Sequence, residues 1–112
     1  MFARVTNWTF EPTQEQVESF IRRGRDEVMP AARQLPGNQA FVWLVDREHG
    51  RGLTLTLWAN AEAEQASAQA ADQFRTGTNQ STGVRMTSAE RYEVAAVDLE
   101  PRLDLAAGRS NV

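Results

Sequence analysis

The sequence contains no cysteine and no lysine, since all twelve basic residues are arginine. The absence of cysteine excludes disulfides, thiolate metal ligands and cysteine nucleophiles. The absence of lysine excludes Schiff-base chemistry and the lysine of a phosphate-binding loop. The single histidine, His49, precedes a glycine in an expected turn, where we predict a solvated side chain and not a catalytic base. With one histidine and no clustered carboxylates, no metal site is expected.

Long apolar runs and an excess of basic charge are also missing. No stretch approaches the 18 apolar residues of a membrane span, and the first residues lack the order of a signal peptide. The net charge of −3 disfavours binding to nucleic acid. We therefore expect a cytoplasmic protein with no cofactor and with neither membrane nor nucleic acid as a partner.

The composition that remains is that of a small globular protein. The chain has 112 residues, of which 41% are hydrophobic and 24% charged, and this suits one hydrophobic core. We predict a single domain over residues 1–97 and a C-terminal tail over residues 98–112.

Hydrophobic periodicity predicts the order strand, helix, strand, strand, helix, strand. Strands are indicated by alternation at 2–8, 39–45, 53–58 and 84–96. Helices are indicated at about 12–29, with a short piece at 31–35, and from Asn60 to about residue 74, before a polar loop at 76–83 that could cover a pocket. The order predicts an α+β, ferredoxin-like βαββαβ fold, with a four-stranded antiparallel sheet and two helices on one face.

The turn between the second and third strands sets a register and therefore two faces. If Val45 pairs with Gly52, one face carries aliphatic residues: Ala40, Val42, Leu44, Leu53, Leu55 and Leu57. We expect this face to lie under the helices. The other face carries Phe41, Trp43, Thr54, Thr56 and Trp58, joined by Arg91 from the last strand and by Arg4, which could pair with Glu93. A second copy of the chain would cover this face in a homodimer, or else the tail would fold back over it.

A pocket is expected beneath the Ala-rich second helix if its small side chains leave room there. Its lining would comprise Val5, Asn7, Phe20, Val42, Leu55 and Tyr92. Asn7 could hold a substrate oxygen and Tyr92 could orient the substrate, while Trp58 could stack on a planar ligand beside Phe20, Val42 and Leu55. In the alternative interpretation Asn7 ties down a turn and the aromatic residues only pack. If the helix lies close to the sheet, no pocket forms and the domain is a dimerisation scaffold.

The segment EVMPAARQLPGNQAFVWLVDREHGRGLTLTLW, with the later strand ERYEV, resembles the antibiotic-biosynthesis-monooxygenase-like dimeric α/β barrels. The resemblance implies a dimeric α/β barrel with Asn7 pointing into its pocket. Some members are cofactor-free quinone-forming oxygenases, and others degrade haem with a histidine on the second helix, which this chain lacks. Two functions follow as hypotheses. One is a cofactor-free monooxygenase of small aromatic or polyphenolic substrates, and the other is a non-catalytic dimer that binds a small ligand or acts as a stress-related scaffold.

Overall fold

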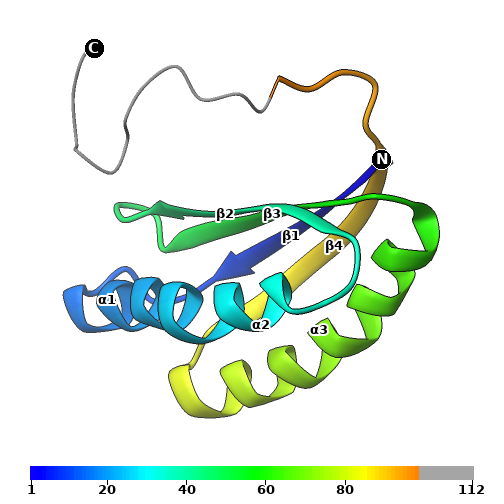
Figure 1. The fold of residues 1–112 in the computed structure, drawn as a ribbon. Coiled ribbons are helices and arrows are strands. Elements are labelled where there is room, and N and C mark those ends of the chain that lie inside the picture. The colour runs from blue at the N-terminus through cyan, green and yellow to red at the C-terminus, as the bar shows by residue number, and fades with distance from the viewer. Residues whose placement is uncertain (99–112) are drawn as a thin grey trace.

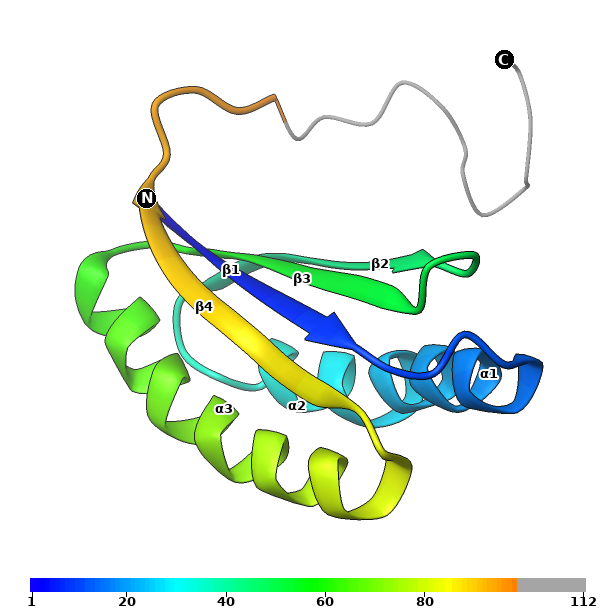
Figure 2. The same ribbon diagram turned by 180° about the vertical axis from the view of Figure 1, so that it is seen from behind.

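The computed structural model describes the backbone of residues 1–98 and the side chains of residues 1–72 and 83–98. The elements in chain order are β1 (Phe2–Thr9), α1 (Gln14–Arg23), η1 (Gly24–Val28), α2 (Met29–Arg33), β2 (Asn38–Asp46), β3 (Arg51–Trp58), α3 (Ala61–Thr82) and β4 (Arg85–Glu93). Neighbouring strands are antiparallel in the order β2-β3-β1-β4. All helices lie on one face of this sheet (Figures 1 and 2). The predicted ferredoxin-like α+β fold is confirmed.

The first helical segment begins at Thr13, whose side chain accepts a hydrogen bond from the Gln16 backbone N–H at 3.2 Å. Its middle section, η1, is a π-helix, and Pro30 follows at the start of α2, where its ring leaves the helix without one backbone N–H donor. The π section begins at Gly24, and the Trp43 ring lies directly over this residue. A Cβ at this position would be 2.0 Å from that ring. The absence of a side chain at Gly24 therefore lets the helix approach the sheet closely.

The second helix, α3, is longer than the sequence suggested. The Asn60 side chain caps it by accepting from the Ala63 N–H at 2.8 Å, as predicted. The helix then continues to Thr82, and Gly83, with a left-handed φ of 73°, ends it. The predicted loop at 76–83 is therefore wrong over all but its last residue, and with it the suggestion of a covering loop. The glycine within this stretch does not end the helix, because a single glycine inside a helix lowers helix stability by only about 1 kcal/mol.

The register of the β2–β3 hairpin agrees with the prediction from Val45–Gly52 to Ala40–Leu57. An irregularity between Asn38 and Ala40 ends this register and brings Asn38, instead of Gln39, opposite Trp58. Because side chains alternate along a strand, this register keeps the two predicted sets of residues on opposite faces.

The orientation of the two faces is the reverse of the prediction. Thr54, Thr56 and Trp58 are buried beneath the helices, with exposures of 7%, 6% and 2%. Phe41 and Trp43 share that face, and the Trp43 ring stacks on Phe20 of α1 with centroids 4.5 Å apart. The aliphatic side is the open one, where Val42 and Leu44 remain 39% and 49% exposed.

Indole hydrogen bonding explains why the aromatic face lies inside. A buried tryptophan needs an acceptor for its N–H. Trp8 Nε1 donates to Thr54 Oγ1 and Trp58 Nε1 donates to Thr56 Oγ1, both at 2.8 Å. Each threonine thus satisfies a neighbouring indole, and polar and aromatic residues pack together without a hydrogen-bonding penalty.

The main core lies between α1 and the sheet. It comprises Trp8, Phe10, Val17, Phe20 and Val84, with Ile21, Trp43, Val45 and Met86 packed against it. After β4 the chain continues as coil, and Val94 N–H donates to the Met1 carbonyl at 2.9 Å. The alternative in which the tail covers the sheet depends on Leu99, Leu103 and Leu105, which lie outside the described residues. Within residues 1–98, no helix has the length and apolarity to cross a membrane.

Candidate functional site

A cavity of about 160 Å³ lies between the sheet and the helices. All four strands contribute side chains to its floor, and η1, α2 and α3 form its walls. The lining residues are Arg4, Thr6, Trp8, Val28, Ala31, Ala32, Leu35, Phe41, Thr54, Thr56, Trp58, Ser67, Ala70, Ala71 and Met86. The pocket that the sequence placed beneath the Ala-rich helix therefore exists, although on the other set of side chains.

Small side chains on both helices keep this space open. Ala31 and Ala32 face it from α2, and Ala70 and Ala71 face it from α3. A methyl group reaches only a short distance toward the sheet, so these alanines cannot fill the space between the helices and the sheet. The floor is aromatic and hydroxylated, which suits a flat ligand with polar substituents.

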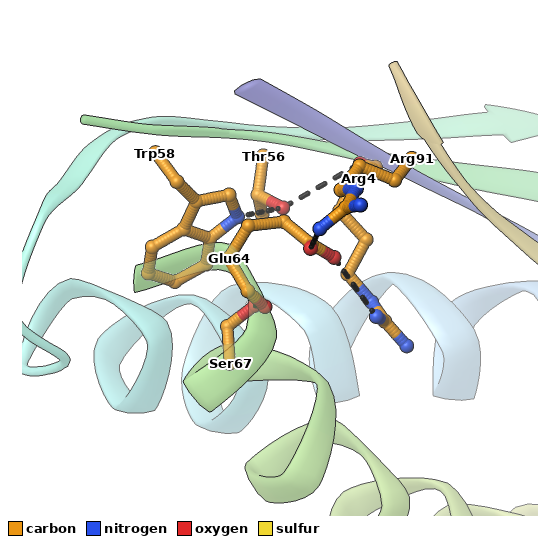
Figure 3. A network of polar contacts seen from close by, with 6 residues as sticks. All are labelled: Arg4, Thr56, Trp58, Glu64, Ser67 and Arg91. Carbon is orange, nitrogen blue, oxygen red and sulfur yellow. Dashed lines mark hydrogen bonds and ion pairs between the residues drawn. The ribbon is translucent and has the colours of Figure 1, made fainter. Parts of the chain in front are cut away.

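A buried carboxylate from α3 lies next to the cavity. Glu64 is 4% exposed and lies between two arginines of the sheet (Figure 3). Its Oε2 is 3.4 Å from Arg4 Nη1 and its Oε1 is 3.3 Å from Arg91 Nη1. Ser67 holds the helix turn by donating its hydroxyl to the Glu64 carbonyl at 2.6 Å. One carboxylate thus faces two guanidinium groups, which leaves a net charge of +1 in this network.

Arg4 connects the network to the cavity. Its side chain lines the cavity and is 13% exposed, and its Nε is buried without a hydrogen-bond partner among the described residues. Arg91 is 43% exposed and lies over the Phe2 ring, with Cζ 5.5 Å from the ring centroid. The pairing of Arg4 with Glu93 is wrong, because Glu93 lies opposite Phe2 and the carboxylate of α3 takes its place.

The two predicted catalytic residues lie on the open face of the sheet. Asn7 Nδ2 donates to Ser88 Oγ at 3.0 Å, and Tyr92, 52% exposed, donates its hydroxyl to Glu90 at 3.2 Å. That carboxylate raises the pKa of the Tyr92 phenol, since the phenolate would face a like charge. Their expected position under the helices is wrong because the faces are reversed. Their catalytic roles remain predictions, and neither lines the cavity.

Of the predicted substrate contacts, only Trp58 lines the cavity. Phe20 is 1% exposed and belongs to the core beside it, and Val42 and Leu55 lie on the open face. The predicted dimer contacts Phe41, Trp43, Thr54 and Thr56 point toward the helices, and Arg91 binds Glu64 on that side. An interface on the open sheet face would therefore not contain them.

Sequence reasoning missed Arg4 and Thr6 as lining residues of the cavity, and it missed Glu64 as the buried carboxylate next to it. A signal was present for Glu64, because Glu64, Ser67 and Ala71 follow helical spacing on one side of α3. That side packs against the sheet, and a carboxylate there needs a cationic partner, which the in-register neighbours Arg4 and Arg91 supply.

The β2–β3 turn contains a second polar cluster. Asp46 binds Arg51 at 2.8 Å and His49 Nδ1 at 3.0 Å, and its Oδ1 accepts from the His49 N–H. The Arg51 and His49 hydrogen bonds lower the pKa of Asp46 to about 2. The cluster is exposed and closes the turn, which agrees with a solvated His49. Among the described residues, no group of histidine and carboxylate side chains has the arrangement of a metal site.

Comparison with solved structures identifies proteins of the same architecture. A monooxygenase of Streptomyces coelicolor, from the gene ActVA-Orf6 and in complex with nanaomycin D, superposes with a TM-score of 0.67 over 89% of this chain and 92% of its own, at 11% identity. SnoaB, a cofactor-independent oxygenase of Streptomyces nogalater, gives 0.61 over 88% and 97%, at 15% identity. The chain has the fold of these monooxygenases. A dimeric ferredoxin-like protein from an uncultured marine organism gives 0.63 over 88% and 98%, at 13% identity.

Among curated sequences, the chain is similar to two uncharacterized proteins of Mycobacterium tuberculosis. It is 31% identical to Rv2557 over 102 residues and 36% identical to Rv2558 over 69 residues. These matches cover 91% and 62% of this chain, but only 44% and 28% of the relatives. The chain thus spans less than half the length of the curated relatives that it matches. No family model matches the sequence.

Proposed function

We propose that the cavity binds a single-ring phenol and that the protein oxygenates this substrate with molecular oxygen without a cofactor. The observation that carries the proposal is the cavity, which has an aromatic and hydroxylated floor and an arginine in its wall. The fold shared with cofactor-independent SnoaB supports this reaction class.

The volume of the cavity sets the size of the substrate. An engineered apolar cavity of about 150 Å³ in another protein binds benzene. The space here is about 160 Å³, so it accommodates one ring with small substituents. A fused polycyclic substrate would need the helices to move apart.

The charge around the cavity favours the anionic form of such a substrate. Arg4 and Arg91 share one carboxylate, so the network carries a net positive charge beside the cavity. A cation near a phenol favours the phenolate, and the released proton passes to solvent. A phenolate is a much better electron donor than the neutral phenol, and a phenolate that carries further electron-donating substituents can reduce molecular oxygen directly.

The proposed reaction balances without a cofactor. The phenolate gives one electron to O₂, and the resulting radicals combine into a peroxide anion at the ring carbon para to the oxygen. This anion takes a proton from solvent and becomes a hydroperoxide. Loss of water from this hydroperoxide leaves a quinone. A phenol with a free para C–H plus O₂ thus yields a quinone plus water, with one oxygen atom in each product. The protein contributes orientation, desolvation and charge.

Oxygen uptake with a panel of electron-rich phenols tests the proposal. We expect uptake above buffer, with one ¹⁸O atom from ¹⁸O₂ in the quinone by mass spectrometry. Arg4→Gln should slow the reaction at least tenfold, because it removes the cation beside the phenolate. Arg47→Gln, which removes an exposed arginine paired with Glu18, should not. Uptake no faster than in buffer would overturn the proposal, and binding without uptake would indicate a non-catalytic ligand-binding protein instead.

We also propose that the open sheet face binds a second copy of the chain. Val42 and Leu44 are 39% and 49% exposed there, on a face where Leu53 and Leu55 lie opposite them. A contiguous aliphatic surface favours self-association, and the dimeric ferredoxin-like neighbour supports a homodimer. Light scattering should give twice the chain mass of 12.5 kDa. Leu44→Glu should give the monomer mass, whereas Arg33→Glu on α2 should not, and a wild-type monomer at micromolar concentration would refute the dimer.

A further inference from the structure

Two threonines of the cavity floor lie side by side. The register of β1 and β3 places Thr6 opposite Thr54. Both side chains are 7% exposed and both line the cavity. Directly opposed residues of antiparallel strands have Cβ atoms about 5 Å apart, so the two hydroxyls can reach one common atom above the sheet.

Neither of these hydroxyls donates a hydrogen bond to an acceptor in the described part of the chain. Thr54 Oγ1 accepts from Trp8 Nε1 at 2.8 Å, but within the described chain its own O–H donates to no acceptor. The Thr6 hydroxyl makes no hydrogen bond to any described residue. Thr56 differs, because its hydroxyl accepts from Trp58 and also contacts the Arg4 carbonyl at 3.5 Å. Both hydroxyls face the cavity, so two donors without an acceptor from the described chain suit an acceptor atom on a ligand.

We propose that the Thr6 and Thr54 hydroxyls form a two-donor site that holds an oxygen atom of the ligand. This site makes the cavity select rings bearing a phenolate, phenol or carbonyl oxygen over hydrocarbons of the same size. The inference rests on the proposed function, since it names the groups that orient the substrate oxygen.

The Trp8 indole strengthens the Thr54 donor. A hydroxyl that accepts a hydrogen bond becomes a better donor, because successive hydrogen bonds polarise one another. The indole also fixes the rotation of the Thr54 side chain, so the donor is oriented before the ligand arrives. Arg4 in the cavity wall supplies positive charge, and the two hydroxyls orient the ligand oxygen. This oxygen is then held above the sheet, and the ligand ring lies between the aromatic side chains of the cavity.

Binding measurements on the full chain, with phenol and toluene as probes, test this inference. The two molecules have similar size, and only phenol carries oxygen. By calorimetry we expect wild type to bind phenol at least tenfold more tightly than toluene. Thr54→Val and Thr6→Val should each weaken phenol binding about tenfold, the usual effect of losing one hydrogen bond, and leave toluene binding unchanged. Thr54→Ser, which keeps the hydroxyl, should retain the preference, and so should Thr9→Val, a matched change outside the cavity on the same strand.

The outcomes separate this inference from the proposed function. Equal binding of phenol and toluene by wild type overturns the two-donor site but leaves a cavity for aromatic rings. Equal loss of both ligands in the valine variants also overturns it, because the effect would then be structural. A preference for phenol that depends on the hydroxyls, without oxygen uptake, supports the two-donor site and overturns the oxygenase. Failure of wild type to bind either probe overturns both.

Discussion

Filling the cavity from α3 should stabilise the protein and abolish ligand binding together. Ala70 faces the cavity, and Ala70→Leu adds three carbon atoms to it. The space of about 160 Å³ has room for these atoms. Three buried carbons recover about 2.4 kcal/mol at about 0.8 kcal/mol each. Ordering the leucine side chain costs about 0.5–1 kcal/mol, so we expect a net gain of about 1.5 kcal/mol.

Urea unfolding and phenol titration of the same samples measure both effects. The unfolding midpoint of Ala70→Leu should rise with an unchanged slope, and phenol should no longer bind or raise it. Ala66→Leu on the exposed side of α3 is the matched control, with an expected change within about 0.5 kcal/mol. A variant destabilised by more than 1 kcal/mol would refute the existence of usable space beneath α3. A variant that still binds phenol would refute the assignment of this cavity as the phenol-binding site.

Three further substitutions test the packing, the ion pairs and the turn. Gly24→Ala should lower the free energy of unfolding in urea by about 2 kcal/mol, because the new methyl group meets the Trp43 ring. Alanine is the better helix former, so a more stable variant would refute the close approach of Trp43 to Gly24. Glu64→Gln should cost about 3 kcal/mol, since it leaves Arg4 buried without a counter-charge, and a loss below 0.5 kcal/mol would show that the pairing is unimportant. Asp46 has a lowered pKa of about 2, so its stabilising contribution is complete above its ordinary pKa near 3.8 and disappears as pH falls toward 2. Wild type should therefore exceed Asp46→Asn in urea midpoint at pH 5 and match it at pH 2, and an equal difference at both pH values would contradict the assignment.

The sequence determined the strands, the hairpin register and the composition of each sheet face, but not which face lies inside. Alternation has a period of two, so it separates Thr54 and Thr56 from Leu53 and Leu55 without ranking the two sets. A comparison of hydrophobicity favours burying the leucines. It omits the indole N–H groups of Trp8 and Trp58, whose need for acceptors makes the threonines suitable for burial.

Some of the residues in and beside the cavity could be predicted from the sequence, and others could not. Trp58 and the room beneath α3 could be anticipated, because a large aromatic residue and an Ala-rich helix are visible in the sequence. The pairing of Arg4 with Glu64 could not, since it joins the first strand to the second helix, and only the fold brings the two side chains within 3.4 Å. Asn7 and Tyr92 were predicted to line the pocket because they lie on the sheet face that was expected to be covered by the helices. That face is the open one, so one wrong orientation explains both errors.

The most direct measurement is a crystal structure of the protein with phenol bound in the absence of oxygen. We expect the ring in the cavity between the sheet and α3, with one ligand oxygen within hydrogen-bond distance of both Thr6 and Thr54. A ring bound on the open sheet face beside Asn7 and Tyr92, or a cavity that remains empty at saturating ligand, would contradict the assignment of this cavity as the substrate site.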